Sequence, residues 1–234
     1  MIEKNIFQSW YSRELPPLVQ SKIDGFLKMN PAYKYHLYTD DDMEQFVKDN
    51  YPGIIYECYK RLNIIVAKVD LWRYLILYKE GGVYLDMDSS IEKPLDELIL
   101  PDDEAIMTVE KNPGIYVQWG MIFKSKHPIL KRTIEYVVDN IQRNAYPNDI
   151  HKMTGPTVIS RALNDIHFSI FNVPLEHAKI HAKTDTTYRT NTISYRIYGV
   201  DYSGYFQFKH EHSDLLYVNH KHWMQVEREV KLLK

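Results

Sequence analysis

Asp86 and Asp88 stand one residue apart at the end of a short apolar run, Val83–Leu85, which is typical of a buried strand. Because side chains alternate along a strand, we expect the two carboxylates on one side and Met87 on the other. Open α/β sheets bind ligands at the carboxyl ends of their strands. Carboxylate oxygens suit Mg²⁺ or Mn²⁺, which often also bind substrate phosphates. The pattern predicts a divalent-cation site, although most isolated Asp-x-Asp pairs are solvated turn carboxylates.

A helix is predicted directly before this strand, over residues 61–80. Its apolar residues recur at helical spacing, which indicates one face buried against a sheet. Gly81 and Gly82 can adopt the positive φ angle that ends a helix. The apolar residues of this face are Ile64, Ala67, Leu71 and Leu75.

Asp70 and Arg73 lie three residues apart on the predicted helix and therefore share a face. Taken alone, they would form an ordinary surface ion pair, which stabilises a helix by roughly a few tenths of a kcal/mol. Because this helix leads directly into the carboxylate strand, the alternative is that both groups face the predicted cation site.

The stretch VDLWRYLILYKEGGVYLDMD, residues 69–88, resembles the Asp-x-x-Arg-Tyr … Gly-Gly-x-Tyr-x-Asp-x-Asp signature of glycosyltransferase family 32. Its spacing is also similar to that of the large clostridial glucosylating toxins. The resemblance implies the GT-A type of α/β fold, a Rossmann-like central mixed sheet flanked by helices. It also implies a retaining enzyme that uses a nucleotide sugar as donor and Mn²⁺ or Mg²⁺ as cofactor.

The resemblance implies catalytic roles for four residues of the central stretch. Asp88 would hold the metal, and Asp86 would share it or bind ribose and sugar hydroxyls. Arg73 would hold a phosphate or sugar oxygen through its planar guanidinium group. Asp70 would accept hydrogen bonds from the donor sugar and fix Arg73.

Other residues are predicted to bind the donor. Trp10 ends the first predicted strand, where the family stacks an aromatic ring on the base; the alternative is a half-buried core tryptophan. Tyr84 precedes Asp86 by two residues and could contact the same ligand. Gln118 could bind a sugar hydroxyl or simply face water. Gly155, in a Thr-Gly-Pro match, could offer free N–H groups at a helix start or only begin a turn. The complete predicted donor set is Trp10, Asp70, Arg73, Tyr84, Asp86, Gln118 and Gly155.

The C-terminal segment is expected to supply a third metal ligand. Tyr217 and His220 keep the family's Tyr-x-x-His spacing, but Gln225 and Val226 replace the expected serine and tryptophan. His222 is therefore a competing ligand. The predicted metal set is Asp86, Asp88 and His220, with His222 as the alternative.

Local patterns predict an alternation of strands and helices in one GT-A domain, residues 1–234. Residues 1–100 would form the nucleotide-sugar-binding half, and residues 101–234 the acceptor-binding half with the C-terminal metal-ligand segment. Residues 165–214 lack periodicity and are expected to form loops and short strands. Predicted strands are 5–10, 33–38, 105–110, 116–123 and 215–220; predicted helices are 16–29, 40–51, 128–143, 157–164 and 224–233.

Composition and net charge exclude several other classes of protein. A chain of 234 residues is long enough for one well-packed α/β domain. A net charge of −2 gives no electrostatic case for binding nucleic acid. Cys58 is the only cysteine, so no internal disulfide can form. With no visible signal peptide or transmembrane segment, we expect a cytoplasmic protein or a sequence trimmed of an anchor, and peripheral membrane contact stays open.

These observations together predict a metal-dependent retaining glycosyltransferase that moves a hexose from GDP-mannose or a UDP-hexose to a glycan or glycolipid hydroxyl. Gln118-Trp119 and residues 125–130 resemble the fungal α-1,6-mannosyltransferase branch, which favours GDP-mannose. The alternatives are a non-catalytic carbohydrate-binding or nucleotide-sugar-binding protein on the same fold and a metal-dependent nucleotidyltransferase.

Overall fold

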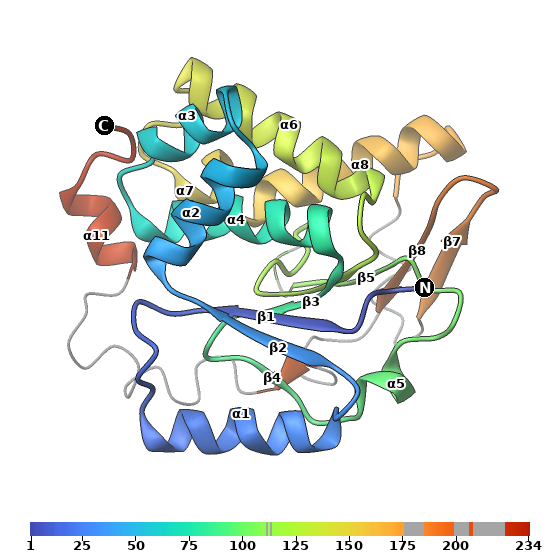
Figure 1. The fold of residues 1–234 in the computed structure, drawn as a ribbon. Helices are drawn as coiled ribbons and strands as arrows, with labels where there is room; N and C mark the ends of the chain where they lie inside the picture. The colour runs from blue at the N-terminus through green and yellow to red at the C-terminus, as the bar shows by residue number, and fades with distance from the viewer. Residues whose placement is uncertain (111, 113, 176–184, 199–205, 208–222) are drawn as a thin grey trace.

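A seven-stranded mixed sheet with the strand order β2-β1-β3-β6-β5-β8-β7 forms the centre of the protein (Figure 1). The structure is a computed structural model that describes residues 1–110, 112, 114–175, 185–198, 206–207 and 223–234. A separate antiparallel pair joins β4 (Ser90–Ile91) and β9 (Phe206–Gln207). The strands of the large sheet are β1 (Asn5–Ser9), β2 (Lys34–Tyr38), β3 (Gly82–Leu85), β5 (Ala105–Thr108), β6 (Gly120–Phe123), β7 (Thr186–Arg189) and β8 (Ser194–Tyr198).

The directions of neighbouring strands decide what meets at the end of β3. Strands β2 and β3 both run parallel to β1, so the carboxyl ends of these three strands share one edge of the sheet. Strand β6 runs antiparallel to β3, and Gly120 pairs with Leu85. The residues before β6, including Gln118, are therefore brought beside the end of β3.

Helices cover both faces of the sheet, as Figure 1 shows. Helices α1 (Pro17–Met29) and α5 (Leu95–Leu98) lie on one side. The opposite side carries α2 (Asp40–Asn50), α3 (Ile54–Arg61), α4 (Ile65–Glu80), α6 (Pro128–Arg143), α7 (Ile150–Met153) and α8 (Pro156–Phe171), and α11 (Trp223–Glu229) lies at one end. Among the described helices, none has both the length and the apolar character needed to cross a bilayer.

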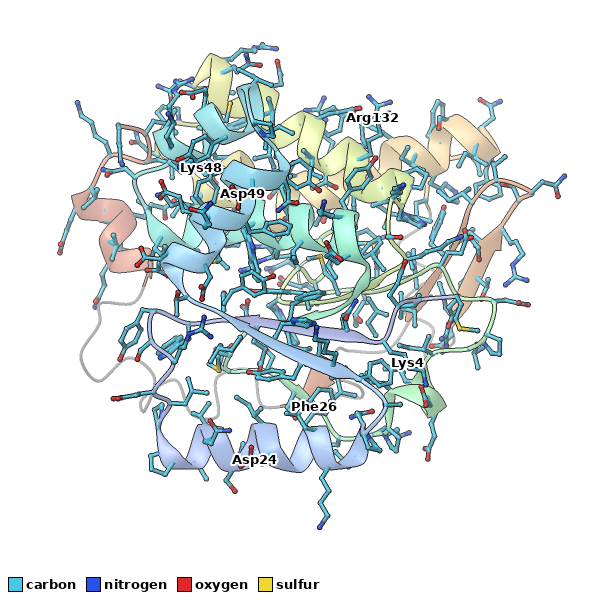
Figure 2. The ribbon with its side chains drawn as sticks, in the orientation of Figure 1. Lys4, Asp24, Phe26, Lys48, Asp49 and Arg132 are labelled. Atoms are coloured by element: carbon cyan, nitrogen blue, oxygen red, sulfur yellow. The ribbon has the colours of Figure 1, made fainter. Side chains whose placement is uncertain are left out.

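Alternation along the strands builds two hydrophobic layers. Ile6 and Val83 belong to the layer that contains Phe26 of α1, whereas Phe7 and Tyr84 belong to the layer under the larger helix group. Phe26 points from α1 toward the sheet in Figure 2, and Asp24 of the same helix points away. The sheet is therefore buried on both faces, as expected for its short apolar strands.

Helix α4 is buried more completely than its periodicity indicated. The sequence predicted one buried face, but consecutive residues from Asp70 to Leu77 are all buried. The reason is that α4 lies between the sheet and the neighbouring helices α2 and α6 (Figure 1). Polar side chains on this helix consequently need partners inside the protein.

Most predicted elements are confirmed, with differences in the C-terminal half. Helix α8 ends at Phe171 rather than at residue 164, and β8 joins the large sheet from a stretch predicted as loops and short strands. Helix α3 was not predicted, and α4 begins at Ile65 rather than at residue 61. The strand predicted at residues 215–220 lies outside the described residues, and the last predicted helix is observed as α11.

Gly82 begins β3 with a φ of +116°, and an added Cβ would lie 2.5 Å from the carbonyl oxygen of Asn5. We predict that Gly82→Ala lowers the free energy of unfolding by about 2 kcal/mol or more, since the backbone oxygen cannot move aside cheaply. Gly25→Ala is the matched control because nothing lies within 4 Å of its added Cβ. In the exposed face of α1 it should stabilise by up to about 1 kcal/mol. Chemical unfolding measures both, and equal effects would contradict this geometry.

Candidate active site

The predicted carboxylates lie in a turn rather than on a strand. Strand β3 ends at Leu85, and the N–H of Ser89 donates to the carbonyl of Asp86 at 3.0 Å. Strand alternation therefore does not relate Asp86 to Asp88, in contrast to the sequence prediction. Met87 packs against α1 in a small apolar cluster, which holds the middle of the turn against the sheet.

Backbone hydrogen bonds fix the start of this turn. The N–H of Asp86 donates to the carbonyl of Trp119 at 2.7 Å, and its carbonyl accepts from Gln8 Nε2 at 3.1 Å. The other end of the Gln8 amide accepts from the Tyr35 hydroxyl at 3.0 Å. Asp86 is thus held by β1, β2 and the segment before β6 together.

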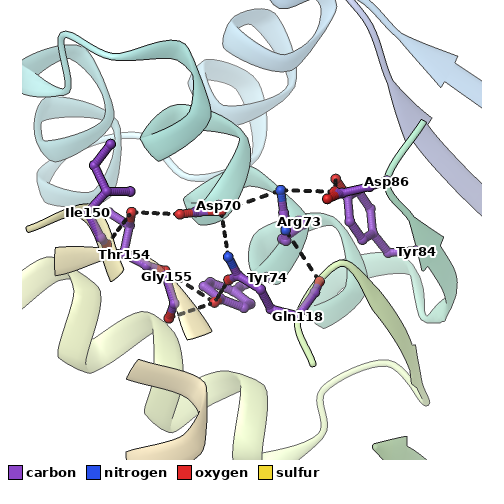
Figure 3. Close-up of polar contacts among 9 residues, drawn as sticks. All are labelled: Asp70, Arg73, Tyr74, Tyr84, Asp86, Gln118, Ile150, Thr154 and Gly155. Carbon is purple, nitrogen blue, oxygen red and sulfur yellow. Dashed lines mark hydrogen bonds and ion pairs between the residues drawn. The ribbon is translucent and has the colours of Figure 1, made fainter. Parts of the chain in front are cut away.

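Arg73 lies between two carboxylates (Figure 3). Its Nη2 is 3.4 Å from Asp70 Oδ1 and 3.2 Å from Asp86 Oδ1, and its Nη1 donates to the carbonyl of Gln118 at 3.3 Å. The guanidinium carbon lies 4.7 Å from the centre of the Tyr84 ring, whose hydroxyl donates to Asp86 at 2.7 Å. Burial opposes the charge, yet Asp86, Tyr84 and Asp70 raise the pKa of Arg73 above its ordinary value. The guanidinium group is therefore a permanent buried cation.

Asp70 is 1% exposed, and both of its oxygens accept hydrogen bonds. Gln118 Nε2 donates to Oδ1 at 3.0 Å, and Thr154 Oγ1 donates to Oδ2 at 2.9 Å. Burial raises the pKa of Asp70, while Arg73 and the Thr154 hydrogen bond lower it by less. The interpretation of Asp70 and Arg73 as a surface pair is therefore wrong.

Two residues of this network, Tyr74 and Thr154, were absent from the predicted site. The Tyr74 hydroxyl contacts Gln118 Oε1 and lies 3.1 and 3.3 Å from the carbonyl oxygens of Thr154 and Gly155. Both residues belong to the motifs matched in the sequence, the Asp-x-x-Arg-Tyr and Thr-Gly-Pro segments. Their place in these motifs was the sequence signal that could have identified both residues. Gln118, for which facing water was the alternative, points into the protein.

Gly155 supports the network through packing. Its N–H donates to the carbonyl of Ile150 at 2.9 Å, so it is not the free N–H group that was one of the two roles predicted for this position. An added Cβ would lie 2.7 Å from the Cα of His151. Glycine at this position lets α7 approach the start of α8 and sets the place of Thr154.

Trp10 follows β1 at the same edge of the sheet. Its backbone N–H donates to the carbonyl of Tyr38 at 3.0 Å, and its ring packs with Tyr11 and the cluster that contains Met87. Trp10 is half-buried, so stacking on a nucleotide base stays a prediction.

The residues available for a metal ion are the two carboxylates of the turn. Asp86 has 24% of its side chain exposed and Asp88 is half-buried, which fits ligands that face a bound ion, whereas Asp70 is enclosed. Within the part of the chain that the structure describes, no group of three or more His, Cys, Asp or Glu side chains could hold a metal. His220 and His222 lie outside the described residues, so the third ligand stays a prediction.

The region that contains this site is similar to a known protein family. Residues 16–105 match the family model described as "Glycosyltransferase sugar-binding region containing DXD motif". This stretch contains Asp70, Arg73 and the Asp86–Asp88 turn. The match confirms the resemblance on which the predicted site was based.

Two fungal relatives share this similarity. The chain is 35% identical over 145 residues to inositol phosphoceramide mannosyltransferase 3 of Schizosaccharomyces pombe, covering 62% of this chain and 38% of the relative. It is 26% identical over 180 residues to the initiation-specific alpha-1,6-mannosyltransferase of Candida albicans, covering 65% and 46%. The chain thus spans less than half the length of either protein.

A solved structure confirms the fold class. The structure described as PaToxG Glycosyltransferase superposes with a TM-score of 0.56 at 20% identity, covering 70% of this chain and 69% of that one. The predicted GT-A type of α/β fold is therefore confirmed.

Replacing Arg73 tests the buried charge cluster. We predict that Arg73→Met lowers the free energy of unfolding by about 3 kcal/mol at neutral pH, because two carboxylates lose their shared cation. The pKa of Asp70 is already raised in the fold and would rise further in the variant. A carboxyl group whose pKa is raised in the folded state stabilises the fold less as pH rises. The difference in free energy of unfolding between wild type and variant should therefore grow between about pH 4 and pH 7.

Arg13→Met is the matched control for this experiment. Arg13 lies 2.6 Å from Asp42, but 65% of the Arg13 side chain is exposed. Its removal should cost less than about 1 kcal/mol and show little pH dependence. A deficit for Arg73→Met that stays constant across this pH range would contradict the assigned pairing.

Proposed function

We propose that this chain is a glycosyltransferase that moves a hexose from a nucleotide sugar to a hydroxyl of a glycan or glycolipid. The observation that carries the proposal is the Asp86–Asp88 turn at the carboxyl edge of β3, held by buried Arg73 inside the matched sugar-binding region. Its partly exposed carboxylates give a ligand access, and its backbone is anchored on both sides.

Transfer breaks the anomeric bond and leaves negative charge on the nucleoside diphosphate, so stabilising this charge is the main catalytic task. Asp86 and Asp88 would hold a divalent ion, Mn²⁺ or Mg²⁺, together with His220 or His222. When bound, the ion supplies positive charge that stabilises the departing diphosphate. Arg73 orients Asp86 and adds a permanent cation beside it, and Asp70 fixes Arg73. Direct contacts of Asp70 and Arg73 with the donor remain part of the proposal.

GDP-mannose is the favoured donor, because both fungal relatives are named as mannosyltransferases. A UDP-hexose is the alternative. The name of one relative also supports an inositol-phosphate glycolipid as acceptor class. In this proposal, residues 1–100 form the donor half and residues 101–234 the acceptor half, with Gln118 extending from the second half toward Asp70.

A screen of sugar nucleotides identifies the donor. We predict that GDP-mannose with Mn²⁺ raises the melting temperature, since a ligand at about 100 times its Kd stabilises the folded state by roughly 2.7 kcal/mol. UDP-glucose, UDP-galactose and UDP-N-acetylglucosamine are the matched comparisons. A donor that binds without slow hydrolysis would favour a binding protein, and release of pyrophosphate would favour a nucleotidyltransferase.

Removing Asp88 tests the metal site. We predict that Asp88→Ala reduces Mn²⁺-dependent release of nucleoside diphosphate by at least about 100-fold, a typical loss when a charge-stabilising group is removed. Asp41→Ala, at an exposed position in the first turn of α2, is the control and should retain turnover. Undiminished metal-dependent turnover by the Asp88 variant would refute this assignment.

A further inference from the structure

The Tyr74 hydroxyl lies among three oxygen atoms and has one proton. Its neighbours are Gln118 Oε1 and the carbonyls of Thr154 and Gly155 (Figure 3). The carbonyls can only accept hydrogen bonds, so the phenol must act as the donor. Tyr74 is completely buried beside Asp70, and burial followed by this negative charge raises its pKa well above the ordinary value. The hydroxyl therefore keeps its proton over the whole physiological range.

The orientation of the Gln118 amide follows from its two neighbours. Nε2 lies 3.0 Å from Asp70 Oδ1, and an ionised carboxylate only accepts hydrogen bonds. Oε1 faces Tyr74, whose proton it can accept. A flipped amide would place Oε1 against the Asp70 carboxylate and lose that hydrogen bond, and Nε2 would replace the acceptor that faces the Tyr74 hydroxyl. Asp70 therefore selects the orientation that turns Oε1 toward Tyr74, and the phenol proton stabilises the amide in that orientation.

We propose that Tyr74 is a positioning residue that acts through Gln118 on Asp70, an inference that rests on the glycosyltransferase function proposed above. Gln118 and Thr154 fix the two oxygens of Asp70, and Oδ1 lies 3.4 Å from Arg73. Arg73 in turn lies 3.2 Å from Asp86 at the predicted donor site. Tyr74 thus controls the placement of a carboxylate that it does not itself contact.

Tyr74→Phe keeps the ring and removes the proton. We expect kcat/KM for the nucleotide sugar to fall about tenfold, in line with the loss of one buried hydrogen-bond donor. Tyr59→Phe is the matched control, since Tyr59 is also fully buried and its hydroxyl has no hydrogen-bond partner among the described residues. It should leave kcat/KM unchanged. Equal effects of the two substitutions would overturn the proposal.

Gln118→Glu adds a readout that a purely structural role would not change. At low pH the new carboxyl can donate its proton to Asp70, as the amide does, and accept from Tyr74. As pH rises the proton is lost and two buried carboxylates face each other. The pH–activity profile of this variant should therefore have a descending limb that the wild-type profile lacks. The titratable and charged groups around this position are Asp70, Arg73 and Tyr74 of α4, Tyr84 and Asp86 at β3, and His151 of α7.

Combining Tyr74→Phe with Gln118→Glu separates the two explanations. If Tyr74 acts through residue 118, the ionised carboxylate loses its donor, its pKa rises and the limb moves to higher pH. If Tyr74 only supports packing, activity falls equally at every pH and the limb stays in place, which overturns the proposal.

The same comparison can be made without turnover. A carboxyl group whose pKa is raised in the folded state stabilises the fold less as pH rises. Melting temperatures of the Gln118→Glu variant should therefore show the same descending limb, and adding Tyr74→Phe should move it to higher pH in the same way. Wild-type protein that turns over no sugar nucleotide would refute the proposed function alone. The other outcome concerns the Gln118→Glu variant when the wild type is active. If the melting temperature of this variant shows the descending limb but its pH–activity profile does not, the positioning role alone is refuted.

Discussion

The structure depends on one buried guanidinium group placed between two carboxylates. Arg73 is 4% exposed, and a cation at such a position is tolerated only when it is paired and hydrogen-bonded. Asp70 lies on the same helix and Asp86 follows the next strand, so pairing both carboxylates requires the chain to reverse between α4 and β3. Gly81 and Gly82 allow this reversal because both have positive φ angles. The charge cluster and the glycine connection are therefore one structural unit.

The remaining parts of the site come from the direction of the neighbouring elements. Strand β6 runs antiparallel to β3, which brings the chain before it to the end of β3 and lets Trp119 anchor the Asp86 backbone. The close approach of α7 and α8 at Gly155 places Thr154 against Asp70. Asp70 thus receives hydrogen bonds from two segments of the second half of the chain, and a change in either segment would reach Asp86 through Arg73.

Local signals predicted most helix and strand boundaries correctly. Thr39 caps α2 through reciprocal hydrogen bonds with Asp42, and proline begins both α1 and α6. The signal was weaker where tertiary contacts extend an element. Helix α8 continues past the predicted end because Ile166 and Ile170 pack on the core. Helix α3 was not predicted, although Cys58 and Tyr59 of this helix are buried in the same core.

The sequence alone determined the chemistry: the spacing of Asp70, Arg73 and Asp86, and the glycines between them, are local properties of one continuous stretch. Only the tertiary structure decided that Asp70 and Arg73 are buried, and that Tyr74 and Thr154 belong to the site. The physical reason is the distance along the chain. Asp70 accepts hydrogen bonds from residues 48 and 84 positions away, and no local pattern specifies such a pairing. It forms because buried polar groups must find partners, and the packing of strands and helices brings these partners within reach.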